Sequence, residues 1–277
     1  MEIEIFLDKS VDENAGLYFE KAKKAKAKLE GARKALEESK TKLDQLLQEE
    51  SKFIEEEEKK ALKRDRKKEW YEKFHWFFST ERFLCIGGKD ATSNEIIVKK
   101  HLDKEDLVFH TDMAGSPFFI IKDGQKAGEN TINECAQAVA VYSKAWKLGH
   151  GTVDVFYVKP EQVSKEAQSG EFLAKGSFMI TGKTNYLRPN LKYAIGLVNI
   201  VKKNEDGSNI ESSEIIGGPI ESIKKQTENF VVVIPGREKK SVTAKKIRAK
   251  LKGADLDDIT KFLPSGGAEI KKDKKEK

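Results

Sequence analysis

The sequence predicts an α+β protein in which N-terminal coiled-coil helices precede a compact mixed α/β domain with a mainly antiparallel sheet. Between residues 12 and 70 there is no proline, and apolar residues recur every seven positions, which is typical of a coiled coil. From Trp70 to Asp123 short apolar runs alternate with glycine-containing or polar turns, which is typical of strands. We expect boundaries at residues 1–69, 70–200, 201–267 and 268–277, the last a disordered basic tail.

The N-terminal region begins with the alternating stretch Met1 to Leu7, which is either an edge strand or part of a linker. Ser10 or Asp12 can cap the helix that follows. Its two apolar seams are Ala22, Leu29, Leu36 and Leu43, and Ala25, Ala32, Ser39, Leu46 and Phe53. Three arrangements fit: a single long helix that dimerises, a hairpin that turns between Leu47 and Glu55, or a solubilising helix with no partner. The hairpin is the arrangement we favour.

The N-terminal helix is predicted to end in an aromatic cluster, where the central region begins. The cluster consists of Trp70, Tyr71, Phe74, Trp76, Phe77 and Phe78. Strands are then expected at Arg82–Ile86, Glu95–Lys99, Asp106–His110 and Pro117–Ile121. A helix over Gly128–Leu148 follows, capped by Asn130 or by Thr131, whose spacing to Glu134 suits a capping box.

The rest of the chain is predicted to add strands at Thr152–Val158, Gly176–Ile180, Leu191–Ile200, Glu214–Ile216 and Phe230–Ile234. The first of these should be a central strand, because both of its faces carry apolar residues. A basic helix is expected at Lys239–Leu251, with Val242, Ile247 and Leu251 inward. A short helix at Leu256–Leu263 comes last.

Composition restricts the class of protein. The chain has 277 residues, 35% of them charged, a formal net charge of +6 and a pI near 8.9, which favours a polyanionic partner. Its two cysteines, Cys85 and Cys135, lie in apolar contexts, as reduced buried thiols do. No apolar run approaches the ~20 residues of a membrane span, and no secretory signal is present. We therefore expect a cytoplasmic protein without a membrane partner.

The turn GGKDATSNE is the first candidate site. Gly87 and Gly88 allow close backbone approach, so backbone N–H groups with Lys89 and Asn94 can hold a phosphate. Equally, the turn can be a plain hairpin in which Asp90 caps its own backbone. It is not a Walker loop, because that motif's spacing is absent.

His110 and Asp112 form the second candidate. Alternation places them on one face at a strand end, where metal ligation or acid–base work is conceivable. No third ligand is evident, since neither His75 nor His101 has a spacing that joins the pair. A polar pair that touches sugar or phosphate is the better interpretation, and we expect no metal and no cofactor.

Basic residues interleaved with aromatics form the third pattern, as at Lys183, Tyr186 and Arg188. Such interleaving suits single-stranded or looped RNA, whose bases stack on rings while phosphates meet cations. For any single lysine, a solvated surface is the simpler explanation. The RNA-contacting residues we predict are Lys89, Asn94, His110, Asp112, Lys183 and Arg188.

Three stretches, WYEKFHWFFSTERFLCIGGKDATSNEIIVKK, VFHTDMAGSPFFIIKD and GEFLAKGSFMITGKTNYL, resemble the RNA-binding (R) domain of the NFACT family. This family includes the nuclear export mediator factor and bacterial and archaeal ribosome-quality-control proteins. The resemblance covers Asp12 to Leu197, with weaker similarity to archaeal members out to Gly267. The family's N-terminal domain with its Asp-Arg motif, and its helix-hairpin-helix region, have no counterpart here. The chain resembles the C-terminal half of such a protein, or a short relative.

The resemblance implies a non-catalytic module, the NFACT-R-like domain at 70–200, that binds tRNA and rRNA and docks on the large ribosomal subunit carrying stalled peptidyl-tRNA. The missing N-terminal domains, on the same or another chain, are implied partners. Two alternatives stay open. One is a scaffold that binds proteins through the coiled coil, and the other is an RNA-acting enzyme that uses His110 and Asp112.

Overall fold

The computed structural model describes residues 3–64, 69–165, 175–203 and 209–271. They belong to two compact units, Met1–Lys67 and Lys68–Lys277, which are described separately below. The charged tail after Lys271, most of the loop expected at 163–175 and most of the loop expected at 202–207 lie outside the described residues.

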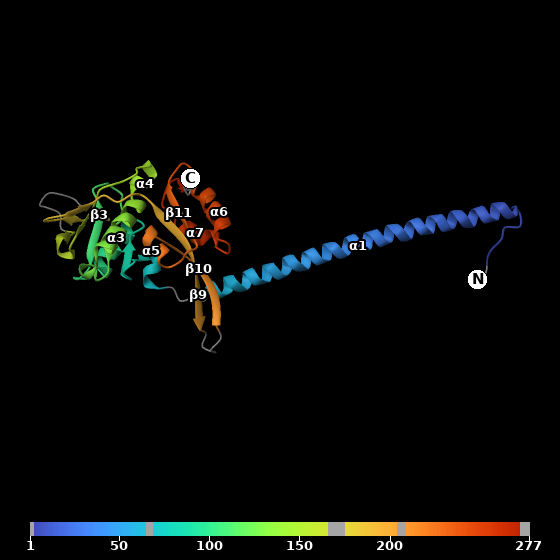
Figure 1. Cartoon of the computed structure of the whole chain (residues 1–277), viewed down its shortest axis with the longest axis horizontal. Helices are drawn as coiled ribbons and strands as arrows, with labels where there is room; N and C mark the ends of the chain where they lie inside the picture. Colours follow the sequence, from blue (N-terminus) through green and yellow to red (C-terminus); the bar gives the residue numbers. More distant parts are fainter. Residues whose placement is uncertain (1–2, 65–68, 166–174, 204–208, 272–277) are drawn as a thin grey trace, which may run out of the picture. The chain divides into compact units, whose positions relative to one another are not determined.

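The first unit is a single helix, α1 (Val11–Arg64), drawn in blue in Figure 1. Ser10 and Glu13 start it reciprocally: the Glu13 N–H donates to Ser10 Oγ (3.2 Å), and the Ser10 N–H donates to Glu13 Oε2 (2.8 Å). The expected hairpin turn between Leu47 and Glu55 is wrong, because α1 continues through this stretch, which holds neither glycine nor proline. The alternative of an edge strand at the N-terminus is also wrong, since residues 3–7 form no strand.

The second unit is built on a six-stranded antiparallel sheet of spatial order β1-β2-β4-β3-β5-β8. Its strands are β1 (His75–Phe78), β2 (Leu84–Gly87), β3 (Leu107–Thr111), β4 (Phe119–Ile121), β5 (Val155–Val158) and β8 (Asn185–Leu187). β5 lies between two partners, so the predicted central strand is confirmed.

The two faces of this sheet are buried under different helices, as strand alternation requires. Phe109 and Phe119 pack in one core with Val139 of α3, whereas Val108 and Ile120 pack in a second core with Ile97. The helical segments are η1 (Trp70–Lys73), α2 (Ala91–Ile96), the π-helical η2 (Ile97–His101), η3 (Gly124–Lys126), α3 (Glu129–Tyr142), α4 (Lys144–Leu148) and η4 (Pro160–Gln162).

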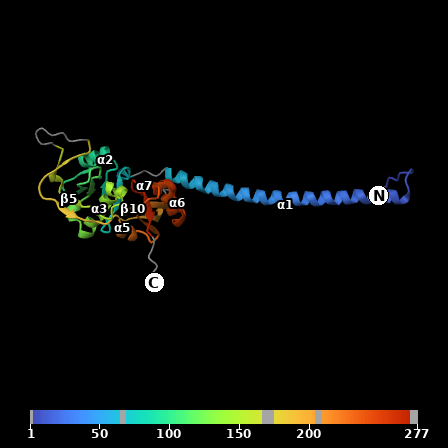
Figure 2. The same cartoon turned by 90° about the horizontal axis from the view of Figure 1, so that it is seen from above.

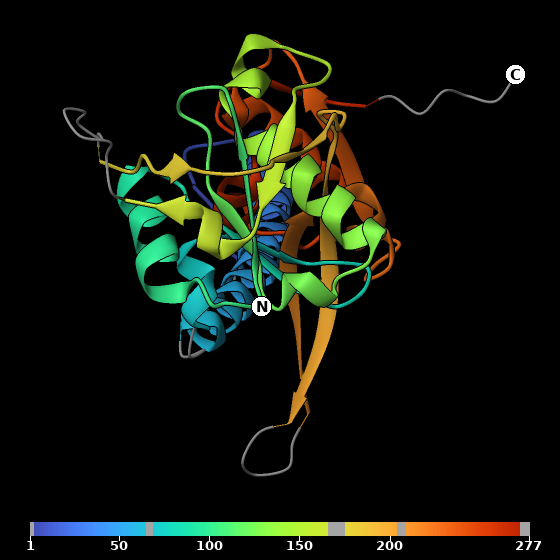
Figure 3. The same ribbon diagram turned by 90° about the vertical axis from the view of Figure 1, so that its left-hand side faces the viewer.

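A four-stranded antiparallel sheet of order β10-β9-β11-β12 follows in the sequence, with three helices. Its strands β9 and β10 form a long ribbon that extends beyond the rest of the unit in Figure 3, and α6 and α7 lie side by side in Figure 2. The elements are β9 (Tyr193–Lys203), β10 (Asn209–Gly218), α5 (Ile220–Lys224), β11 (Phe230–Pro235), α6 (Lys240–Lys250), α7 (Leu256–Phe262) and β12 (Ala268–Ile270), and a separate two-stranded pair is β6 (Val163–Ser164) with β7 (Met179–Ile180).

The predicted strand over Glu95–Lys99 is wrong, because this segment lies in α2 and η2. Asp90 caps α2 through its side chain, which accepts a hydrogen bond from the Ser93 N–H at 2.7 Å. Asn94 and Ile97 are then buried three residues apart, as one face of a helix requires. Capping and packing therefore override the β-propensity of the Ile-Ile-Val run.

Further differences concern element ends. The aromatic cluster is not a helix end: Trp70 and Tyr71 lie in η1, and Trp76–Phe78 belong to strand β1. The 128–148 helix is interrupted at Ser143 and starts after Gly128, while Thr131 and Glu134 are buried and hydrogen-bond to residues 79–81 instead of forming a cap. Val242 is 43% exposed, and Ala268–Ile270, expected in the tail, form β12.

Candidate functional site

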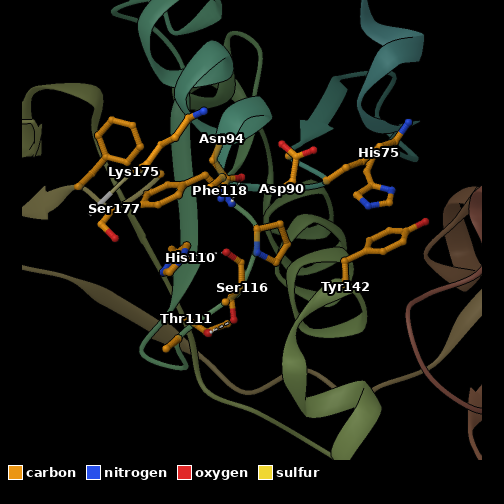
Figure 4. A pocket seen from close by; sticks show the side chains of 18 of the residues that line it. His75, Asp90, Asn94, His110, Thr111, Ser116, Phe118, Tyr142, Lys175 and Ser177 are labelled. Atoms are coloured by element: carbon orange, nitrogen blue, oxygen red, sulfur yellow. Dashed lines mark hydrogen bonds between the residues drawn. The ribbon is translucent and has the colours of Figure 1, made fainter. Parts of the chain in front are cut away.

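A pocket of about 450 Å³ lies beside the first sheet in the second unit. Segments far apart in the sequence form it, namely the turn after β2, helix α2, the β3–β4 loop, Tyr142 at the end of α3, residues 175–180 and Ser265. Figure 4 shows two sides: His75 and Tyr142 on one, and Phe118, His110 and Ser177 on the other. The pocket therefore offers two separate walls to a ligand.

The turn after β2 is built so tightly that its backbone N–H groups are used within the protein. The Gly88 N–H donates to the Phe118 carbonyl at 3.0 Å, and the N–H groups of Lys89 and Asp90 both donate to Ser93 Oγ at 2.8 Å. These three N–H groups are therefore bonded within the protein, and phosphate binding by the turn stays a prediction that depends on Lys89. Asp90 caps its own backbone as the alternative expects, but it does so at the start of helix α2 and not in a plain hairpin. The cation of Lys89 is what the turn presents to the pocket.

Asn94 fixes the position of this turn against the neighbouring strand. Its Oδ1 accepts a hydrogen bond from the Phe118 N–H at 3.1 Å. A Cβ on Gly88 would lie only 1.9 Å from the same oxygen, so the position requires a residue without a side chain. Asn94 is 7% exposed, which makes it a structural support of the pocket wall with only a small surface free for a ligand.

His110 lies in the wall formed by β3 and the loop that follows it. Its Nε2 is 3.1 Å from the Ser116 carbonyl oxygen, and its ring stacks on Phe118 with centroids 4.1 Å apart. Burial lowers the pKa of His110 below its ordinary value, more than its backbone hydrogen bonds and the charge of Asp112 raise it. The imidazole is therefore neutral at physiological pH and acts as a polar surface, not as a cation.

Asp112 has a partner different from that of His110. Its Oδ2 accepts a hydrogen bond from the Tyr186 hydroxyl at 3.2 Å. Tyr186 belongs to β8, the edge strand of the sheet, and is 55% exposed. Because the two side chains bond to different groups, their arrangement does not resemble a coupled acid–base pair. Among the described residues no cluster of three metal-ligating side chains exists.

The opposite wall contains His75 stacked on Tyr142, with ring centroids 3.7 Å apart. Burial, together with the charges of Lys89 and Lys240, lowers the pKa of His75 to about 3. The Tyr142 hydroxyl lies 2.8 Å from that of Tyr193 and donates to the Phe262 carbonyl at 2.9 Å. Burial raises the pKa of Tyr142 well above its ordinary value, so both rings are neutral.

The pKa of Lys89, like that of His110, lies below its ordinary value. Partial burial and the nearby charge of Lys261 lower its pKa, and the carboxylate of Asp90 raises it by less. Lys175 is a second, exposed cation on the pocket wall. The pocket thus combines two lysines, the carboxylates of Asp90 and Asp112, neutral polar groups and ring faces. Its lysines, polar groups and rings are groups that can bind phosphate and sugar.

The structure brings four of the six predicted residues together: Lys89, Asn94, His110 and Asp112 all line the pocket. The other two lie outside the lining, at the two ends of β8. The backbone carbonyl of Lys183 accepts from the Gln162 side chain at 3.0 Å, and Arg188 Nε lies 3.4 Å from Asp154 Oδ1. Tyr186, between them in β8, connects this edge to the pocket through Asp112.

Sequence reasoning missed His75, Tyr142 and Ser265 as pocket residues. In the sequence, His75 is a candidate only for metal ligation, and Tyr142 belongs to the apolar face of a helix. Ser265 follows a predicted helix, and nothing in the sequence indicates that the chain after this helix returns to the pocket. Its position depends on long-range packing, for which no local signal exists.

Comparison with known proteins supplies the identity of the region. Residues 73–182 match the family model described as "NFACT protein RNA binding domain". The chain is 41% identical over 218 residues to "Archaeal Rqc2 homolog aRqcH" of Methanocaldococcus jannaschii, covering 77% of this chain and 31% of that protein. It is 35% identical over 210 residues to "Ribosome quality control complex subunit NEMF homolog" of Drosophila melanogaster, covering 74% and 20%.

The human "Ribosome quality control complex subunit NEMF" is 39% identical over 171 residues, covering 61% of this chain and 15% of that protein. The chain therefore spans less than a third of the length of these relatives. The residues that match the family model include the whole turn after β2 and both His110 and Asp112. The chain carries the NFACT-R RNA-binding domain and is homologous to the C-terminal part of the Rqc2, NEMF and aRqcH ribosome quality control proteins.

Proposed function

We propose that this chain is a non-catalytic module that binds the large ribosomal subunit carrying stalled peptidyl-tRNA and contacts tRNA or rRNA through the pocket and the β8 edge. The observation that carries the proposal is the convergence of Lys89, Asn94, His110 and Asp112 on one pocket within residues 73–182. The printed names of the fly and human relatives assign them to a ribosome quality control complex, which supports the ribosomal context. The location that we propose is the cytoplasm.

Phosphate contacts account for the affinity in this proposal. Lys89 and Lys175 at the pocket, with Lys183 and Arg188 beside β8, supply cations over one region of the second unit. Tyr186 is 55% exposed among them and can stack on an unpaired base. Binding through such groups releases counterions and weakens steeply with salt. The N-terminal domains of the family, on the same or another chain, are proposed partners.

Membrane association plays no part in the proposal. Within the residues that the structure describes, none of the helices has the length and apolar character that a bilayer crossing requires.

Sedimentation of the purified chain with large ribosomal subunits, with and without peptidyl-tRNA and over a salt series, tests the proposal. We expect co-sedimentation that strengthens with peptidyl-tRNA and weakens steeply as salt rises. If the chain stays in the supernatant at low salt, docking on the subunit is wrong, and free tRNA or a protein becomes the partner to examine.

A protein-binding scaffold is the second candidate function, and one observation favours it. Leucines at the heptad positions of α1 remain more than half exposed: Leu29, Leu36, Leu43 and Leu46. A stripe of this spacing is typical of a helix that pairs with another. An RNA-acting enzyme that uses His110 and Asp112 has less support, since each of these side chains is bonded elsewhere.

A further inference from the structure

Two lysines from outside the matched family domain lie near the His75 side of the pocket. Lys261 is in α7, next to Phe262, whose carbonyl accepts the hydrogen bond of the Tyr142 hydroxyl at 2.9 Å. Tyr142 stacks on His75 and lines the pocket. Ser265, four residues after Lys261, lines the pocket as well. The loop after α7 therefore reaches the pocket at Ser265, and Lys261 lies behind this wall, not in the lining itself.

Lys240, the first residue of α6, is tied to the same loop. The Ala268 N–H donates to the Glu238 carbonyl at 3.1 Å, and Thr243 Oγ1 donates to the Ala268 carbonyl at 2.6 Å. The indole of Trp146 holds the loop from the other side by donating to the Gly267 carbonyl at 3.0 Å. These bonds fix the start of α6 beside the loop that contains Ser265.

The charges of these lysines act on the pocket residues and on one another. Lys240 and Lys89 both lower the pKa of His75, and Lys261 lowers that of Lys89. Partial burial also lowers the pKa of Lys240. The charges of Lys89, Lys240 and Lys261 thus act over short distances on His75 or on one another. An anion between the three lysines would relieve their repulsion.

Carboxylates compensate these cations only in part. Lys261 pairs with Asp258 at 2.8 Å. This bond, together with the charges of Asp255 and Asp257, raises the pKa of Lys261 and keeps it charged. Glu238, close to Lys240 in sequence, pairs with Lys246. Within the described residues, neither Lys89 nor Lys240 forms an ion pair shorter than 4 Å. The first turn of α6 also lacks an acidic residue, although its dipole favours an anion there.

We propose that Lys89, Lys240 and Lys261 form one phosphate-binding cluster at the His75 side of the pocket, so that the region after residue 200 takes part directly in RNA binding. This inference rests on the proposed RNA-binding function and extends it to residues outside the matched domain. The ligand is the phosphodiester backbone of RNA, which lysines bind as point charges without reading sequence.

The test measures binding of a fluorescein-labelled oligouridine to the full chain by fluorescence anisotropy over a salt series. Lys240→Gln and Lys261→Gln should each weaken binding by roughly threefold to tenfold at low salt and lower the salt slope by about one. The matched control is Lys245→Gln, which removes an exposed lysine from the next turn of α6. It should bind like the wild type, and Lys240→Arg, which keeps the charge, should retain most of the affinity.

A second measurement needs no variant and guards against misfolding. The accessibility of each lysine to an acetylating reagent is compared with and without oligouridine, and we expect protection of Lys240 and Lys261 but not of Lys245. If the wild type binds while both glutamine variants behave like the control and neither lysine is protected, the cluster is wrong and the RNA-binding function stands. If the wild type binds neither oligouridine nor the large subunit, the proposed function itself fails.

Discussion

His75 shows how one residue of the pocket links packing to charge. Its ring is stacked on Tyr142 at 3.7 Å, where burial and two lysines lower its pKa to about 3. Since an unfolded histidine titrates near 6.5, folding favours the neutral form. The resulting stabilisation is present above pH ~6.5 and is lost as the pH falls toward 3.

His75→Phe should therefore reduce the loss of stability in acid. Phenylalanine keeps a ring against Tyr142 but takes up no proton, so the variant escapes a cost on the order of 5 kcal/mol that the wild type incurs between pH ~6.5 and ~3, of which roughly 3 kcal/mol falls above pH 4. Urea unfolding of both proteins from pH 7 to pH 4 measures the difference, which isolates His75 from other titrating groups. Curves that stay parallel over this range would show that His75 is not held neutral by the fold.

At the residue scale, the sequence indicated which side chains gather but not what they do. Lys89 and Asn94 were predicted from one local turn, and both line the pocket because that turn is itself short and rigid. The role of Asn94 as a support for Phe118 depends on a contact 24 residues away, which local pattern cannot show. Lys183 and Arg188 are absent from the pocket lining. A local pattern could not show this either, because it depends on how distant segments pack.

The β2–α2 connection is the element on which the pocket wall depends. Gly88 lies against Asn94 Oδ1 so closely that an added Cβ would be 1.9 Å from it, and the backbone N of Asn94 would be 2.9 Å away. The Gly88 N–H also bonds to the Phe118 carbonyl. A side chain at position 88 would therefore push α2 away from the strand that follows the pocket loop.

Gly88→Ala should destabilise the protein by about 1–3 kcal/mol through overpacking and weaken RNA binding by displacing Lys89. Gly151→Ala is the control, because a Cβ there meets no atom within 4 Å. Its stability should change by less than about 0.5 kcal/mol. Thermal unfolding of both variants, with anisotropy against oligouridine, measures the effects, and equal behaviour of the two variants would contradict the role given to Gly88.

At the element scale, most strands and the two last helices were predicted from alternation and turn residues. The segment Glu95–Lys99 was not, because its Ile-Ile-Val run has strand propensity while Asp90 and Ser93 supply a helix start. The short strand β8 was not predicted, because its local signal is too weak. It is an edge strand of three residues that pairs only with β5, too short for alternation to reveal.

At the scale of the whole molecule, the two units carry different proposed roles. The second unit holds the pocket and the proposed phosphate cluster, whereas α1 carries the exposed leucine stripe. The heptad pattern correctly indicated a helix over this region. It could not exclude a turn, because an a/d repeat is equally compatible with one long helix and with two that pair.

Removal of residues 1–67 should leave a chain that folds and binds oligouridine within about threefold of the full-length affinity, since the proposed phosphate contacts all lie in the second unit. Circular dichroism and anisotropy measure both properties. Loss of RNA binding by a folded residue 68–277 chain would move the binding surface to α1 and contradict the assignment of the pocket.

RNA binding by the pocket is tested by measuring the affinity of labelled tRNA for the wild type and for Lys89→Ala across a salt series. Lys104→Ala is the matched control, because Lys104 is exposed and lies just before the first residue of β3, whereas His110 is near the last residue of that strand. We expect binding to weaken by roughly threefold to tenfold, and the salt slope to fall by about one, for Lys89→Ala alone. Binding that is unchanged in Lys89→Ala, or reduced equally in both variants, would contradict the pocket as the RNA-binding site.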